Sequence, residues 1–240
     1  QEETLYWAGL IKEARKGDWT RLDEMLKIIN ENKYNEVVTT SFIRLLANCP
    51  DEKKQGAIIN ALKKNSSPLA RSAAAGTLGA SGSEIIKKAL LEGTKDESRL
   101  VRITAAASLA AYDPGSFEPQ EKTAFDKATD EYMHSLITRP DDWSAHYNKG
   151  IFHQSRGESH EALESYETAA RLYPGSLLPL INSSVLYSYT GNQGKAEENL
   201  KKVLDMDPGN EAANLNLGLL LAEQGRLQEA EKALLAALTT

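Results

Sequence analysis

The sequence predicts an all-α fold, a right-handed α-α superhelix assembled from two successive kinds of helical repeat. In the second half, four columns of residues recur with a period of 34 residues. In the first half, the segments 69–79 and 100–110 superpose with a shift of 31 residues. Fixed periods of this size are typical of solenoids, in which each helical unit packs only against its neighbours.

The composition is that of an ordinary globular chain. Of the 240 residues, 41% are hydrophobic and 26% are charged, and the formal net charge is −6. Because there is no basic surplus, we expect no nucleic acid partner. The longest apolar stretch, 217–222, is too short to cross a bilayer, so we expect no membrane insertion. Cys49 is the only cysteine, which excludes an internal disulfide, a cysteine-based zinc site and a CxxCH haem attachment within these residues.

Residues 1–113 read as short amphipathic helices separated by turn-forming residues. The two segments that superpose each carry an arginine, Arg71 or Arg102, followed by alanines and a leucine, and Val37 to Ala47 is a weaker third copy. This pattern resembles HEAT repeats, in which such a segment forms the inner packing helix. Small residues there allow close contact between helices. An irregular helical bundle is the alternative.

Residues 114–142 are predicted to form a joint between the two kinds of repeat. Ala128, Tyr132 and Pro140 lie 34 residues before their counterparts in the next repeat. The segment 119–138 is therefore predicted to be the second helix of a degenerate repeat. Its first helix would fall at the end of the preceding unit, around 110–112.

Residues 143–240 carry the 34-residue period, and each column has a physical role in a pair of antiparallel helices. The glycines provide the tight turn after the first helix, the alanines allow close approach of the second, and the prolines end it. The columns are Asn148, Asn182 and Asn216; Gly157, Gly191 and Gly225; Ala162, Ala196 and Ala230; and Pro140, Pro174 and Pro208.

With these columns filled, the region resembles the tetratricopeptide repeat (TPR) family and contains three repeats. Ser184 stands where the second repeat should have its packing glycine, and His146, Leu180 and Asn214 stand where the family often has tryptophan. The third repeat is truncated within its second helix at Thr240. We therefore expect the parent protein to continue, or this end to pair with another copy.

The order of the three regions also resembles the C-terminal region of bacterial periplasmic multihaem cytochrome c proteins, whose haem-binding motifs precede the HEAT-like part. The resemblance implies a periplasmic location, with a cytoplasmic one as the alternative. It also implies that the chain is a structural or docking arm for a multihaem cytochrome domain, in cis or in trans, that lies outside these residues.

Candidate chemistry is sparse, and we expect no enzyme, no metal site and no cofactor. His146, His153 and His160 are seven residues apart, but the first two occupy packing positions and have no acidic or cysteine ligand at metal spacing. Glu131 and His134 have the spacing of di-iron helix bundles, yet no second copy exists. No nucleophile elbow, phosphate-binding loop or HExxH motif occurs.

The resemblance to TPR proteins implies that the first helix of each repeat lines a concave groove for a protein or peptide. A ladder of three asparagines would then hydrogen-bond the backbone of an extended partner, with apolar side chains supplying most of the affinity. In the alternative, these amides brace adjacent helices. The predicted lining is Tyr147, Asn148, Ile151, Leu178, Ile181, Asn182, Val185, Tyr189, Leu215, Asn216 and Leu219, with Gln154, Ser155 and Glu223 beside them.

The groove lacks the basic residues with which some TPR domains bind a C-terminal carboxylate, so we do not expect that mode of binding. We predict instead a non-catalytic interaction scaffold for an extended peptide or a partner domain.

Overall fold

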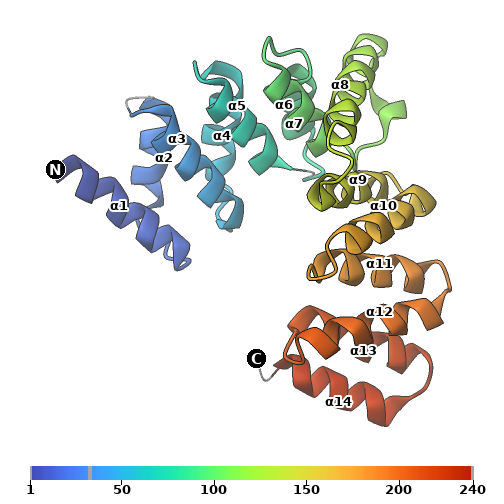
Figure 1. The fold of residues 1–240 in the computed structure, drawn as a ribbon. Helices are drawn as coiled ribbons and strands as arrows, with labels where there is room; N and C mark the ends of the chain where they lie inside the picture. Colours follow the sequence, from blue (N-terminus) through green and yellow to red (C-terminus); the bar gives the residue numbers. More distant parts are fainter. Residues whose placement is uncertain (1, 32–33, 80, 239–240) are drawn as a thin grey trace. The chain divides into compact units, whose positions relative to one another are not determined.

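The computed structural model describes residues 2–31, 34–79 and 81–238. Within these ranges it contains fourteen α-helices, two short 3-10 helices and no strand (Figure 1). The chain divides into two compact units, Gln1–His134 (unit 1) and Ser135–Thr240 (unit 2). The predicted all-α repeat fold is confirmed. The finer division at residues 113 and 142 stays a prediction.

Unit 1 is built of two layers of helices. Its helices are α1 (Glu2–Arg15), α2 (Leu22–Glu31), α3 (Glu36–Leu45), α4 (Lys54–Lys64), α5 (Pro68–Leu78), α6 (Glu84–Gly93), α7 (Arg99–Ser108) and most of α8 (Pro119–Ile137). Helix α5 packs against both α3 and α7, while α4 packs against both α2 and α6. The three segments that matched in the sequence are thus neighbours in one layer.

Hydroxyl groups join the helices of the α3–α5–α7 layer. The Ser72 and Thr104 hydroxyl oxygens are 2.9 Å apart, and Ser108 donates to the carbonyl of Ala75 at 3.0 Å. Thr77 donates in the same way to the carbonyl of Ile43 on α3. Short side chains allow these helices to approach closely, and the hydroxyls satisfy one another or a neighbouring carbonyl, as buried polar groups require.

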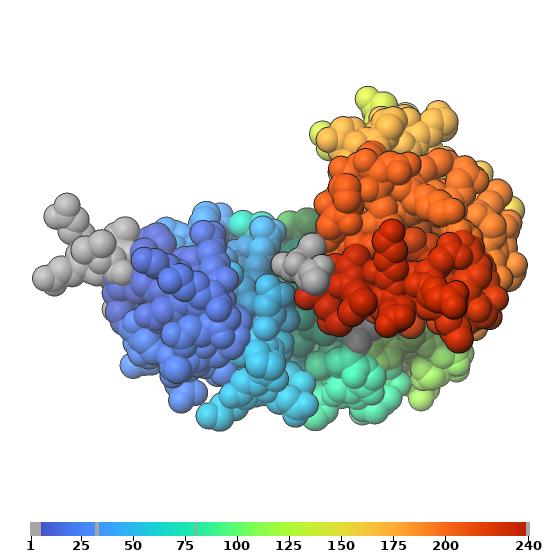
Figure 2. All heavy atoms as spheres, turned by 90° about the horizontal axis from the view of Figure 1, so that it is seen from below, coloured from blue at the N-terminus to red at the C-terminus, as the bar shows by residue number. Residues whose placement is uncertain are grey.

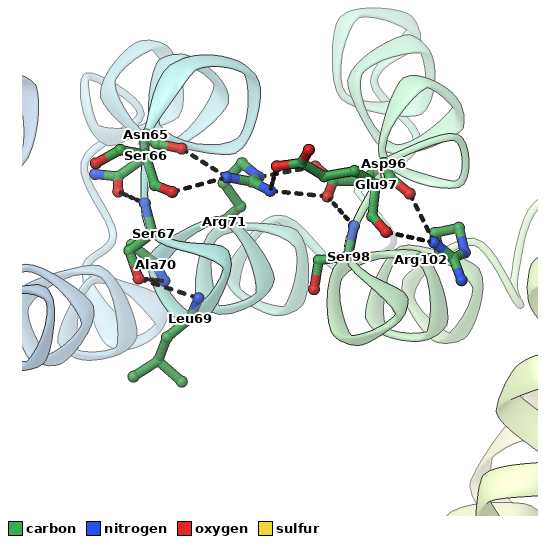
Figure 3. A network of polar contacts seen from close by, with 10 residues as sticks. All are labelled: Asn65, Ser66, Ser67, Leu69, Ala70, Arg71, Asp96, Glu97, Ser98 and Arg102. Carbon is green, nitrogen blue, oxygen red and sulfur yellow. Dashed lines mark hydrogen bonds and ion pairs between the residues drawn. The ribbon is translucent and has the colours of Figure 1, made fainter.

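Arginines repeated along the layer connect successive helix pairs (Figure 3). Arg71 donates to both carboxylate oxygens of Asp96, at 2.8 and 2.9 Å, and to the carbonyl oxygens of Asn65 and Ser66. The side chains of Arg71 and Asp96 are only 8% and 14% exposed. The hydrogen bond and charge of Asp96 raise the pKa of Arg71, so the guanidinium stays charged in this buried position.

Helix α8 is attached to unit 1 by the next arginine of the series. Arg102 donates to both carboxylate oxygens of Glu131 on α8, at 2.9 and 3.0 Å, and its remaining nitrogen donates to the carbonyls of Asp96 and Glu97. Phe125 and Ala128 of α8 lie in the core of unit 1. The stretch 110–112, which the sequence suggested as the first helix of a degenerate repeat, is a turn that follows α7.

Unit 2 contains three antiparallel helix pairs that follow one another, visible as adjacent bands in the space-filling view (Figure 2). We call the first helix of each pair the A helix and the second the B helix. The A helices are α9 (Trp143–Ser155), α11 (Leu178–Tyr189) and α13 (Glu211–Glu223); the B helices are α10 (Ser159–Leu172), α12 (Gln193–Met206) and α14 (Leu227–Leu238).

The predicted glycine column forms the turn inside each pair. Gly157, Gly191 and Gly225 have φ angles of 75°, 83° and 76°, which a side chain would disfavour. In each turn the amide after the glycine donates to a carbonyl five residues earlier, such as Glu158 to His153 at 2.9 Å. This is the hydrogen-bond pattern of a Schellman cap.

A second set of small residues sets the spacing within each pair. A Cβ added to Gly150 would lie 2.5 Å from the ring of Tyr166, and one added to Gly218 would lie 2.6 Å from Leu234. The second repeat has Ser184 at this position, and its hydroxyl donates to the carbonyl of Ile181. The alanine column is buried in the same region, with exposures of 0 to 3%.

Candidate functional site

Charged residues in unit 2 are concentrated on the B helices. Helix α12 alone carries six of them, whereas α11 carries none and α9 carries only Lys149. Helix α13 has one acidic residue near each end, Glu211 and Glu223. The A helices therefore present an almost uncharged surface, as expected of a surface that contacts apolar groups.

The eleven residues predicted to line a groove all lie on the A helices, and none of them is fully buried. We call this set the A-helix face. Six members are large apolar side chains that are 39 to 86% exposed; they are Ile151, Leu178, Val185, Tyr189, Leu215 and Leu219. Asn148 is exposed as well, whereas Tyr147, Ile181, Asn182 and Asn216 are half-buried. Exposed apolar residues on three successive helices form the kind of surface that marks an interaction site.

A hollow of about 280 Å³ opens between α11 and α13 and brings four of the predicted residues together. Val185 and Tyr189 line it from α11, and Asn216 and Leu219 line it from α13. The remaining lining residues are Ser184, Ser188, Leu200, Leu220 and Glu223. Since Leu200 and Leu220 are core residues, the floor is apolar and firmly packed.

The asparagine ladder has different surroundings in each repeat. Asn182 donates to the phenol oxygen of Tyr147 at 3.1 Å and to that of Tyr166 at 3.5 Å, so it braces α11 against the first pair. Among the described residues, Asn148 and Asn216 have no side-chain hydrogen-bond partner. The bracing alternative therefore describes Asn182, while the other two amides are available to a ligand.

Aromatic side chains stabilise the first repeat beneath this face. Trp143 lies against Tyr147 and Tyr173, with ring centroids 6.1 and 5.4 Å apart, and Tyr147 lies 5.8 Å from Tyr166. Tyr166 donates to the Oε1 atom of Gln154 at 2.6 Å, so this predicted lining residue has a structural role. Burial of Tyr166 raises its pKa to about 12.

Sequence reasoning missed the serines and the leucine floor of the hollow. Ser184 was noticed only as a departure from a packing glycine, and Ser188 lies one helical turn further along the same face. Their spacing of four residues was a usable signal, because residues i and i+4 share one side of a helix.

Two of the three evenly spaced histidines, His146 and His153, have structural partners. His146 Nε2 donates to the carbonyl of Pro140 at 3.0 Å, and Asn214 at the equivalent position donates to the carbonyl of Pro208. His153 Nδ1 lies 2.7 Å from a carboxylate oxygen of Glu158. In the part of the chain that the structure describes, no group of three or more His, Cys, Asp or Glu side chains is arranged to hold a metal ion. No helix in the same ranges is both long and apolar enough to span a membrane.

Two family models match the chain, each over a different part of it. A model described as tetratricopeptide repeat matches residues 122–176 and 185–240, and a model described as HEAT repeats matches residues 22–126. The two matches overlap only at the start of α8. The HEAT match thus precedes the TPR match, which is the order that the sequence predicted.

Several characterised proteins share part of the sequence. The tetratricopeptide repeat and J domain-containing co-chaperone DNJ1 of Fusarium oxysporum f. sp. lycopersici is 40% identical over 77 residues, which cover 32% of this chain and 15% of that protein. The photosystem I assembly protein Ycf3 of Synechococcus sp. (strain CC9311) is 32% identical over 89 residues, 36% of this chain and 51% of that protein. The chain thus matches about half of Ycf3 and a small part of DNJ1.

Among solved structures, a crystal structure of MamA protein aligns over 78% of this chain and 92% of that chain, with 15% identity and a TM-score of 0.47.

Proposed function

We propose that the chain is a non-catalytic protein-interaction scaffold and that it binds an extended segment of a partner protein on the A-helix face. The observation that carries this proposal is the set of six exposed apolar side chains on the three A helices, which are almost uncharged. A solvent-exposed apolar surface of this extent is unfavourable in water, and a partner that covers it gains about 25 cal/mol for each Å² of apolar area buried.

The hollow gives the face a place for a specific anchor. Its volume of about 280 Å³ suits one large apolar side chain of the partner. Asn216 at its rim can donate to and accept from a peptide group, a contribution of about 0.5–1.5 kcal/mol. Micromolar affinity requires about 8 kcal/mol in total, most of it from the apolar contacts.

The similar proteins support a protein partner. DNJ1 is described as a co-chaperone and Ycf3 as an assembly protein, two roles in which a protein is held by another. Each match covers about a third of this chain, and the TPR model matches residues 122–176 and 185–240, which include the A-helix face.

A periplasmic location, and a role as docking arm for a multihaem cytochrome domain, remain a finer proposal that rests on the order of the repeats alone. Sequencing the parent gene tests it, since CxxCH motifs upstream of these residues are expected if the chain is such an arm. A parent gene without them contradicts the cytochrome role and leaves the scaffold proposal in place.

The scaffold proposal is tested by selecting random peptides displayed on phage against the purified chain. We expect selected peptides to bind in solution, and we expect Val185→Glu combined with Leu219→Glu to abolish binding by placing charge on the apolar face. The matched control is Met206→Glu, because Met206 is also about half exposed, at 49%, but lies on a B helix. Equal loss of binding in the control, or none in the double variant, contradicts the proposal.

A further inference from the structure

Among the described residues that line the hollow between α11 and α13, Glu223 is the only charged one. It is exposed, and among the described residues it forms no ion pair and no hydrogen bond. Two of the three acidic residues of the neighbouring helix α12 are different, since Glu197 and Glu198 pair with Lys201, Lys202 or Arg226. Glu223 is therefore a charge whose partner is not supplied by unit 2.

The position of Glu223 on its helix is unfavourable for stability. It is the last residue of α13, which has no basic residue in its final turn. The C-terminal end of a helix carries partial negative charge, so a carboxylate there is repelled instead of stabilised. An unpaired carboxylate at this end, beside an apolar hollow, is better explained by a ligand than by folding.

From this geometry we infer that the segment bound on the A-helix face carries a lysine or arginine next to its apolar anchor residue. The anchor enters the hollow against Val185 and Leu219, and the basic side chain reaches the Glu223 carboxylate at the rim. Because no basic residue lines the hollow, an acidic neighbour would find no partner there. The inference rests on the proposed function and adds the chemical class of the ligand.

The test uses synthetic probes of defined chemistry. Each probe is a short peptide with capped ends and leucine at its centre. One flanking position at a time carries lysine, glutamine or glutamate, and the other positions are randomised. Binding to the full chain is followed by fluorescence anisotropy. At one flanking position we expect lysine to bind about two- to fivefold tighter than glutamine, the effect of one partly exposed ion pair, and glutamate to bind most weakly.

Charge reversal makes the test decisive. In Glu223→Lys we expect the order of the three probes to reverse, while Glu211→Lys at the other end of the same helix keeps the wild-type order. Glu223→Lys should be at least as resistant to thermal unfolding as wild type, because a cation suits this end of the helix.

The possible failures are distinguishable. Probes that bind wild type equally, or a lysine preference that survives in Glu223→Lys, overturn the inference and leave the proposed function intact. If no probe binds and the peptides selected by display also fail to bind in solution, the proposed function is contradicted and the inference with it.

Discussion

The two units pack pairs of antiparallel helices by different means. Unit 1 connects successive pairs through buried arginines such as Arg71, which binds a carboxylate and two carbonyls at once. Unit 2 instead brings the helices of each pair together at a small residue, which is Gly150, Ser184 or Gly218. Both devices fix the spacing of helices, but the first depends on charge and the second on the small size of a side chain.

The units also differ in where their apolar surface lies. The exposed large apolar residues of unit 1 that precede α8 are scattered over four helices; they are Tyr6, Val37, Ile85 and Leu100. In unit 2, six such residues share the A helices, and Met206, Leu227, Leu235 and Leu238 lie on the B helices α12 and α14. The comparison indicates that unit 1 keeps its apolar side chains for its own core, whereas unit 2 presents part of them to a partner.

The largest effect is expected from Arg71→Ala in unit 1. The substitution removes the ion pair of the Asp96 carboxylate, which keeps only its hydrogen bond from the Ser98 amide, and it removes the side-chain donor of two backbone carbonyls. We therefore expect a loss of about 3–5 kcal/mol in the free energy of unfolding. Arg44→Ala, an exposed arginine on α3, is the control and should change stability by less than about 0.5 kcal/mol.

Urea unfolding followed by tryptophan fluorescence measures this loss. Unit 1 contains Trp7 and Trp19, and unit 2 contains only Trp143, so a Trp143→Phe background reports on unit 1 alone. A loss for Arg71→Ala no larger than that of the control would show that the arginine series does not stabilise unit 1.

In unit 2, Gly150→Ala is expected to cost about 1–3 kcal/mol, because the new methyl group would lie 2.5 Å from the ring of the fully buried Tyr166. Gly194→Ala is the matched control in the same unit. A Cβ at Gly194 meets nothing within 4 Å, and alanine is the better helix former, so this variant should be as stable as wild type or more so. Thermal unfolding followed by circular dichroism separates the two, and equal stabilities would contradict close packing at Gly150.

Single substitutions can separate the two roles of the asparagine ladder, which are bracing of the helices by Asn182 and peptide binding by Asn216. Asn182→Ala should lower the free energy of unfolding by about 1 kcal/mol, since it removes bonds to Tyr147 and Tyr166. Asn216→Ala should leave unfolding unchanged and weaken binding of a selected peptide by up to about tenfold, measured by isothermal titration calorimetry. Peptide affinity unchanged in Asn216→Ala would remove the ladder from the binding site.

The smallest effect at neutral pH concerns one tyrosine in each unit, the half-buried Tyr132 and the fully buried Tyr166. Burial raises the pKa of both Tyr132 and Tyr166 to about 12. In the unfolded chain the same tyrosines ionise near pH 10, so the unfolded state releases these protons at a lower pH than the folded state. The stability that the two tyrosines contribute below pH 10 is therefore lost as the pH rises toward 12. Urea midpoints should therefore fall over this range, and by less in Tyr166→Phe. A constant midpoint up to pH 12 would contradict the burial of both rings.

The repeat architecture was readable from the sequence because its columns have local causes. Gly157, Gly191 and Gly225 occur where the backbone needs a positive φ, and Ala162, Ala196 and Ala230 occur where the helices touch. Such requirements recur in every repeat, so the period exposes them. The membership of the A-helix face followed from the same register.

Contacts that occur in only one repeat could not be predicted from the sequence. Nothing in the spacing of Glu131 shows that it accepts bonds from Arg102, which lies 29 residues earlier on α7. The bonds from Asn182 to two tyrosines were equally hidden, because they depend on which side chains lie opposite each other across the helices. The hollow was hidden as well, because its lining comes from α11, α12 and α13, and the sequence does not show how closely side chains of different helices pack.

The most direct test of the central claim, that the A-helix face of unit 2 binds a partner segment, is an NMR titration of the isotopically labelled chain with a peptide selected by display. We expect the shifted signals to map to α11 and α13, with Val185, Asn216 and Leu219 among the largest changes, and the exposed residues of α12 and α14 to be unaffected. Shifts confined to the B helices or to unit 1 would contradict it.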